Sequence, residues 1–154
     1  MADTRTIEQS LTVDAPPADV FRALTDADAL KRWWITDGTS DPRSGGRFRY
    51  EWKMADESRD HVQEGTYDAV VDGVVVAYPW AAGEAGDTHV TLALVRDDGG
   101  TRVSLVHSGF ATDPATDAIH AQHDQGWHGF LANLKSVLEG GEDNRAAMGV
   151  QTLR

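Results

Sequence analysis

Leu105-Val106-His107-Ser108-Gly109-Phe110 precedes a segment that contains Gly126-Trp127, and these two stretches decide the fold. The first alternates apolar and polar residues, which predicts a strand whose His107 faces inward. The second belongs to a helix whose inward stripe contains His120, His123, Trp127, Leu131 and Leu134. A strand of a curved sheet and a long helix that closes over it enclose space. The strand and the helix together therefore predict a fold that encloses a cavity.

The order of the remaining predicted elements sets the fold class. Strand patterns occupy segments 6–13, 47–53, 62–71, 74–80, 90–94 and 103–107. Two short helices are expected after the first strand, around Phe21 and Leu30, and the long helix follows Pro114 and runs to about Leu138. This order predicts an α+β fold in which a curved six-stranded antiparallel sheet wraps the last helix.

The length of 154 residues fits one domain that can bury a core of its own. Residues 1–139 are expected to form this domain, because Gly140-Gly141 ends the long helix. Residues 140–154 are expected to form a tail that is flexible or weakly docked.

The composition excludes several classes of function. With no cysteine, disulfides, thiol nucleophiles and cysteine-based zinc sites are ruled out. A net charge of -11 argues against nucleic acid as a partner, because phosphate binding needs a basic surface. The sequence contains no basic amphipathic stretch for a membrane surface, no apolar run long enough to span a membrane and no signal-peptide pattern. A cytoplasmic location is therefore expected.

Aromatic residues at inward-facing positions predict the wall of a ligand cavity. The alternative is that these side chains fill the space between sheet and helix without leaving a cavity. The predicted cavity residues are Trp33, Tyr50, Trp52, Tyr67, Ala69, Tyr78, Trp80, Leu92, Leu105, His107, His123, Trp127 and Leu131.

The histidines offer two further interpretations. His107, His120 and His123 could form a three-histidine zinc site, but a His-x-x-His pair fixes no ligand geometry. Histidines hydrogen-bonded at a cavity wall are the preferred interpretation, and no metal or other cofactor is predicted. If the protein is a catalyst, His107 is the first candidate for an acid or base, because a strand would hold it rigidly. Serine-hydrolase elbows, Walker loops and dinucleotide fingerprints do not occur in the sequence.

A set of short motifs, taken in order, is typical of a known family. They are Val13-Asp14-Ala15-Pro16, Val20-Phe21-Arg22-Ala23-Leu24-Thr25-Asp26, Leu30 with Trp33-Trp34, Gly45-Gly46-Arg47-Phe48-Arg49-Tyr50, Glu64-Gly65-Thr66-Tyr67, His107-Ser108-Gly109-Phe110 and Gly126-Trp127 with Leu131 and Leu134. Over nearly its full length the chain resembles the START-like (SRPBCC) superfamily, in the branch related to the activator of the heat-shock protein 90 ATPase. The resemblance implies a helix-grip fold that encloses an apolar cavity.

The resemblance leaves three functions open. The first is a module that binds an apolar or aromatic small molecule, with Tyr hydroxyls and His107 setting its orientation. The second is a cyclase-like or isomerase-like enzyme that uses His107 in the cavity. The third is a co-chaperone-like interaction domain. The eukaryotic co-chaperone has a separate chaperone-binding domain with no counterpart here, which argues against a chaperone partner. Edge strands and an exposed Trp33-Trp34 pair leave a homodimer open.

Overall fold

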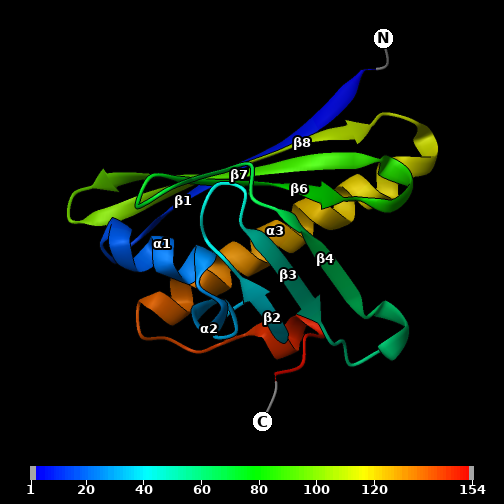
Figure 1. The fold of residues 1–154 in the computed structure, drawn as a ribbon. Helices are drawn as coiled ribbons and strands as arrows, with labels where there is room; N and C mark the ends of the chain where they lie inside the picture. Colours follow the sequence, from blue (N-terminus) through cyan, green and yellow to red (C-terminus); the bar gives the residue numbers. More distant parts are fainter. Residues whose placement is uncertain (1–2, 153–154) are drawn as a thin grey trace.

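Two antiparallel sheets form most of the fold in the computed structural model, which describes residues 3–152. The strands are β1 (Thr4–Val13), β2 (Asp37–Ser40), β3 (Arg47–Trp52), β4 (His61–Thr66), β5 (Ala69–Val71), β6 (Val75–Ala81), β7 (Asp87–Asp97) and β8 (Gly100–Ala111). The larger sheet has the order β1-β8-β7-β6-β5, and the smaller has the order β2-β3-β4 (Figure 1). All pairings within both sheets are antiparallel.

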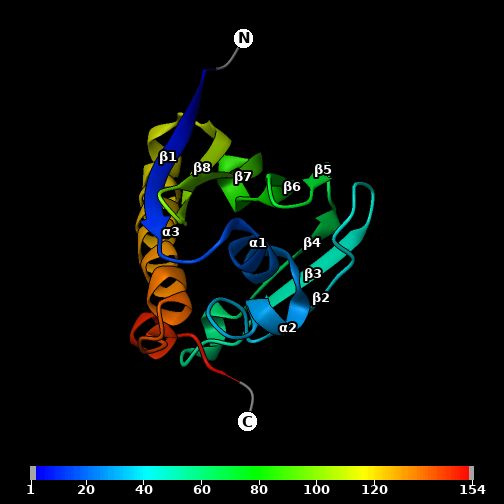
Figure 2. The same ribbon diagram turned by 90° about the vertical axis from the view of Figure 1, so that its left-hand side faces the viewer.

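The long helix and the smaller sheet enclose the core from opposite sides. The helices are α1 (Pro17–Thr25), α2 (Ala27–Leu30) and α3 (Asp117–Leu138), and the short 3-10 turns are η1 (Glu57–Arg59), η2 (Gly83–Ala85), η3 (Pro114–Thr116) and η4 (Arg145–Met148). Figure 2 shows α3 along one side of the molecule, β2–β4 along the other and α1 between them. None of the helices within residues 3–152 has the length and apolarity needed to cross a membrane.

The predicted α+β class is confirmed, with two short helices after the first strand and a long helix that ends at Leu138. The sheet differs in detail, because eight strands within residues 3–152 form two sheets where six strands in one were expected. The predicted strand 62–71 divides at Tyr67, whose N–H and C=O bond to Gly46 and Gly45 at 2.8 Å each. β4 therefore pairs with β3, and β5 pairs with β6. β2 was not predicted, because its sequence DGTS contains no apolar residue.

A single side chain joins the two sheets where their backbones separate. Gln63 on β4 is 3% exposed, and its carboxamide donates to the C=O of Ala81 (2.7 Å) and accepts from the N–H of Ala81 (3.0 Å) on β6. Both hydrogen bonds imitate a backbone ladder, so the buried polar groups stay satisfied. The smaller sheet is thereby fixed against β6, and the aromatic face of β3 is directed towards α3.

A β-bulge in β8 directs one more aromatic side chain inward. Arg5 pairs with Phe110 and Thr6 with Ser108, which leaves Gly109 as the extra residue, with φ +96°. Strict alternation from His107 would direct Phe110 outward. The bulge resets this alternation, so Phe110 is fully buried with its ring centroid 4.5 Å from that of His107.

Candidate functional site

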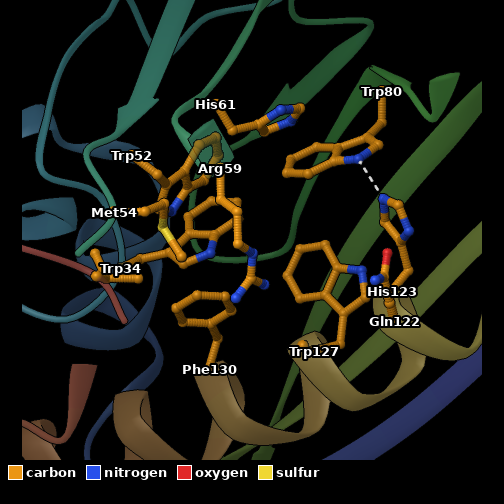
Figure 3. A pocket seen from close by; sticks show the side chains of 12 residues that line it. Trp34, Trp52, Met54, Arg59, His61, Trp80, Gln122, His123, Trp127 and Phe130 are labelled. Atoms are coloured by element: carbon orange, nitrogen blue, oxygen red, sulfur yellow. Dashed lines mark hydrogen bonds between the residues drawn. The ribbon is translucent and has the colours of Figure 1, made fainter. Parts of the chain in front are cut away.

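An apolar pocket of about 210 Å³ lies between α3, β3, β6 and the turn before β4 (Figure 3). It opens to solvent on one side. The lining residues are Trp34, Trp52, Met54, Arg59, His61, Trp80, Gln122, His123, Gly126, Trp127, Phe130 and Val150. This lining contains no Asp or Glu among the described residues, although the chain has 25 acidic residues.

Trp34 is the centre of the pocket wall. Its ring centroid lies 5.2 Å from that of Trp52, 5.4 Å from Trp127 and 6.0 Å from Trp80. These partners belong to β3, α3 and β6, so one side chain that follows α2 contacts all three walls. Aromatic pairs at such distances contribute about 0.5–1.5 kcal/mol each beyond area burial. The wall is therefore one packed cluster.

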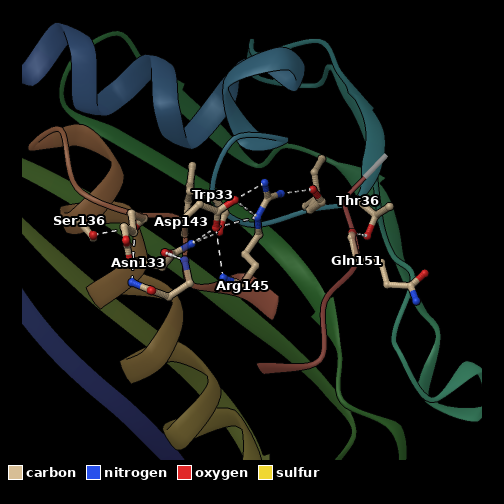
Figure 4. Close-up of polar contacts among 10 residues, drawn as sticks. Trp33, Thr36, Asn133, Ser136, Asp143, Arg145 and Gln151 are labelled. Carbon is tan, nitrogen blue, oxygen red and sulfur yellow. Dashed lines mark hydrogen bonds and ion pairs between the residues drawn. The ribbon is translucent and has the colours of Figure 1, made fainter. Parts of the chain in front are cut away.

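An ion pair between the buried Arg145 and the exposed Asp143 in the C-terminal segment holds the backbone next to Trp34. Arg145 is 4% exposed, and its guanidinium bonds to the carboxylate of Asp143 (Nη2–Oδ2 2.6 Å) and donates to the C=O of Ile35 (2.8 Å) (Figure 4). The side chain of Asn133 on α3, 2% exposed, donates to the C=O of Trp33 at 2.7 Å. The polar groups on both sides of Trp34 are thus tied to α3 and to the segment after it.

The same segment supplies part of the pocket. Asn133 accepts from the N–H of Asn144 (2.6 Å), Thr36 donates to the C=O of Gln151 (2.5 Å), and Val150 forms a bridge with Met54. Val150 is 2% exposed and lines the pocket. The sequence predicted a flexible or weakly docked tail, whereas these contacts hold its described part, residues 140–152, against the body. Residues 1–2 of the predicted domain and 153–154 of the predicted tail lie outside the described residues.

His107 lies behind the pocket and is fully buried. The hydroxyl of Thr88 donates to the C=O of Trp80 (2.7 Å), so it accepts from Nε2–H of His107 (2.7 Å). Nδ1 of His107 accepts from Nε1–H of Trp127 (2.9 Å). This network fixes a neutral tautomer with both ring nitrogens occupied.

The environment of His107 opposes acid–base chemistry near neutral pH. Burial, with a smaller contribution from repulsion by His123, lowers the pKa of His107 from 6.5 to about 3. A general base must reach the proton that it abstracts, and His107 has neither a free nitrogen nor solvent contact. Its position favours a structural role that orients Trp127.

Two other histidines line the pocket in neutral form. Nε2 of His123 accepts from Nε1–H of Trp80 (3.2 Å), and its Nδ1 lies 2.8 Å from the C=O of Ile119, to which it donates. Nε2 of His61 accepts from the carboxamide of Gln63 (2.8 Å). Burial is the main cause that lowers the pKa of both histidines. Arg59 is therefore the one charged group of the described pocket lining at neutral pH.

Of the predicted cavity residues, Trp52, Trp80, His123 and Trp127 line the pocket. Another group of them packs in the core away from it. That group is Trp33, Tyr50, Tyr67, Tyr78, Leu92, Leu105, His107 and Leu131, each at most 3% exposed. Ala69 lies on β5, the edge strand of the larger sheet, half-buried and outside the pocket lining.

The hydroxyls of Tyr50 and Tyr67 form a chain inside the core, and no tyrosine lines the described pocket. Tyr50 bonds to Tyr67, Tyr67 bonds to Oγ of Ser40 (2.6 Å), and Ser40 donates to the C=O of Thr25 (2.6 Å). The hydroxyl of Tyr78 is buried without a hydrogen-bond partner among the described residues. Alternation along β3 and β6 gave the correct inward direction for these rings, but they lie too deep to reach the pocket.

Sequence reasoning missed the rest of the lining, which is Trp34, Met54, Arg59, His61, Gln122, Gly126, Phe130 and Val150. Phe130 lies three residues after Trp127 on α3, so helical spacing could have placed it. Arg59 and His61 follow a charged connection with no periodic pattern, and no local signal marks them.

The expectation of an exposed Trp33-Trp34 pair is wrong. The two residues are 1% and 2% exposed, and their rings stack with centroids 5.4 Å apart. Nε1–H of Trp33 donates to the C=O of Ala23 (2.8 Å), which fixes this ring under α1. The pair offers no apolar surface for a second copy of the chain.

Comparisons with known proteins agree with this architecture. Residues 14–139 match the family described as Activator of Hsp90 ATPase homolog 1-like protein. Protein MLL2253 from Mesorhizobium loti is similar at 23% identity and a TM-score of 0.75, over 90% of this chain and 99% of that one. The Aha1 dimer from Colwellia psychrerythraea has the same identity and TM-score, over 90% and 98%. CV1439 from Chromobacterium violaceum shares 27% identity with a TM-score of 0.71, over 87% and 96%. No curated protein gave a match.

Proposed function

Because the chain belongs to the family of Activator of Hsp90 ATPase homolog 1-like proteins, within the START-like superfamily, we propose that it binds a small apolar or aromatic molecule. The single observation that carries this proposal is the pocket walled by Trp34, Trp52, Trp80 and Trp127. Sites for small molecules are concave and mostly apolar, with few polar groups. In this proposal residues 1–139 form the binding domain and Val150 completes the wall.

The pocket favours binding over catalysis. The nitrogens of His123 and the indole N–H groups of Trp80 and Trp127 are already engaged in internal hydrogen bonds. A ligand would therefore gain mainly from burial of its apolar surface, about 25 cal/mol per Å². The volume of about 210 Å³ is below the roughly 300 Å³ at which drug-sized sites begin, so the ligand is expected to be small.

Native mass spectrometry of freshly purified protein tests the proposal. We expect a reproducible excess mass that leaves on denaturing organic extraction, because the tryptophan wall would bury the apolar surface of the ligand. A clean apo mass, together with no binding of any aromatic compound in a fragment screen by NMR, would contradict the proposal.

Gly126 offers a matched test of where the ligand lies. It lines the pocket from α3, and a Cβ added there meets no atom within 4 Å among the described residues. Gly126→Leu is expected to fill the pocket and weaken binding at least about tenfold. The free energy of unfolding should hold or rise, because Leu exceeds Gly in helix propensity by up to about 0.8 kcal/mol. Calorimetric titration and urea denaturation measure the two effects.

Gln125→Leu is the control, because Gln125 is exposed on the same helix and does not line the pocket. It adds a leucine to α3 one position away, so it should leave binding unchanged. Equal binding by the wild type and the Gly126→Leu variant would place the ligand elsewhere.

A further inference from the structure

Arg59 is an exposed residue that adds a single positive charge to the lining of the pocket in an acidic protein. Its side chain makes no hydrogen bond or ion pair with any described residue, and Figure 3 shows its guanidinium reaching towards the rings of Trp127 and Phe130. The net charge of the chain is -11, yet the described lining has no carboxylate, and Asp56, which interacts electrostatically with Arg59, lies in the same turn outside the lining. The charge inside the pocket is thus opposite in sign to that of the protein.

The position of Arg59 is fixed by the short turn that carries it. Asp56 accepts from the N–H of Ser58 (3.1 Å), its C=O accepts from the N–H of Arg59 (2.9 Å), and Asp60 accepts from the N–H of Met54 (2.8 Å). These bonds close the segment between β3 and β4 into a compact turn. The guanidinium therefore projects from an anchored backbone.

Several polar groups around the pocket are committed to internal hydrogen bonds, although the buried indole N–H of Trp52 has no partner among the described residues. Trp80 donates to His123, Trp127 donates to His107, and both nitrogens of His123 are occupied. The guanidinium of Arg59 remains as a donor that can present two parallel N–H groups, an arrangement that matches a carboxylate.

The aromatic rings of the pocket lining set the shape of the apolar part of a ligand. Trp34 and Trp80 are nearly parallel, at 12° with centroids 6.0 Å apart, and Phe130 meets Trp34 edge-on at 6.3 Å. Flat rings pack well against such walls in offset or edge contacts. With about 210 Å³ available, one or two fused rings fit and a long acyl chain does not.

We propose that the ligand is a small planar aromatic carboxylate, with its rings against Trp127 and Phe130 and its carboxylate paired with Arg59. This inference rests on the proposed small-molecule function and adds the charge and the shape of the ligand. Arg59 is then the residue that determines specificity for anions.

Calorimetric titration with 2-naphthoate and its neutral isostere 2-naphthamide tests the inference. The wild type is expected to bind 2-naphthoate at least about tenfold more tightly than 2-naphthamide, and this ratio should fall with added salt because the charge pair is partly solvated. Arg59→Gln should bring the ratio close to one while retaining affinity for 2-naphthamide. Arg96→Gln is the matched control, because Arg96 is exposed on β7 and outside the pocket lining.

The outcomes separate the two proposals. Equal affinity for both compounds in the wild type, or a preference that survives Arg59→Gln, would overturn the anionic ligand and leave the aromatic pocket standing. Binding of neither compound would overturn the aromatic carboxylate, and the small-molecule function would then be decided by native mass spectrometry and the fragment screen. Preference for 2-naphthoate that is lost in Arg59→Gln and in Gly126→Leu, but not in Arg96→Gln, would establish the carboxylate site within the pocket.

Discussion

Between about pH 6 and about pH 4, the free energy of unfolding is expected to fall by about 1.4 kcal/mol per pH unit through His107 alone. The pKa of His107 is lowered from 6.5 to about 3, so the unfolded chain binds a proton in this window and the folded chain does not. The stability from neutral His107 is complete above about pH 6.5 and is lost as the pH falls towards the folded pKa. Urea denaturation at a series of pH values measures the slope.

His107→Gln removes this proton-binding difference. Its stability is expected to be lower than that of the wild type at pH 7, because the donors and acceptors of Thr88 and Trp127 lose their partner. Between about pH 6 and about pH 4, the free energy of unfolding of the variant should fall less steeply than that of the wild type, by about 1.4 kcal/mol per pH unit. His61 and His123, whose pKa values are also lowered, contribute equally to both proteins. Identical slopes would show that His107 is protonated in the folded state.

Arg145→Met is expected to destabilise the protein by about 2 kcal/mol, which lies between the value for an exposed ion pair, at most about 1 kcal/mol, and the roughly 3–5 kcal/mol for a fully buried pair. The change leaves the C=O of Ile35 without its donor and removes the guanidinium from the carboxylate of Asp143, which keeps its hydrogen bond from Asn133 (2.9 Å). Asp143 has a side-chain exposure of 32%, so water can take over part of the lost bonding, which is why the intermediate value is expected. The midpoint of urea unfolding measures the effect.

The matched control is Arg43→Met. Arg43 pairs with Asp41 at 2.7 Å, but both side chains are at least half exposed. Exposed ion pairs contribute at most about 1 kcal/mol. A loss of stability in Arg145→Met no larger than in Arg43→Met would mean that the segment after α3 adds nothing to the fold.

Elements with a clear local period were predicted well. Phe48, Tyr50 and Trp52 alternate along β3, and all three are buried. The end of α3 at Leu138 follows from the glycines that succeed it. Both signals lie within a few adjacent residues, so they can be read without knowledge of the tertiary structure.

Features that depend on distant contacts were not predicted. The division between β4 and β5 depends on Tyr67 meeting Gly45 and Gly46 across the chain. The inward turn of Phe110 depends on a bulge at Gly109 that strand alternation does not reveal. The anchoring of Arg145 depends on a carbonyl 110 residues away. Each of these contacts is set by tertiary packing and has no local pattern.

The residues of the candidate site also fall into a group that the local pattern predicted and a group that only the tertiary structure places. Alternation correctly directed Trp52 and Tyr50 inward, yet only Trp52 reaches the pocket. Alternation gives the face of a sheet and not the depth below its surface. Arg59, the charged residue of the pocket, lies in a turn whose position comes from hydrogen bonds to Asp56 and Asp60 on either side of it. The three-dimensional structure was needed to place it.

The cluster around Trp34 has a spectroscopic consequence. All five tryptophans of the chain belong to it, because Trp33 stacks on Trp34 and Trp34 contacts Trp52, Trp80 and Trp127. With centroids 5–6 Å apart, the indoles exchange excitation and emit as one coupled set, with none elsewhere in the chain to dilute the signal. Intrinsic fluorescence and near-ultraviolet circular dichroism therefore report on the tryptophan cluster that walls the pocket, without any label.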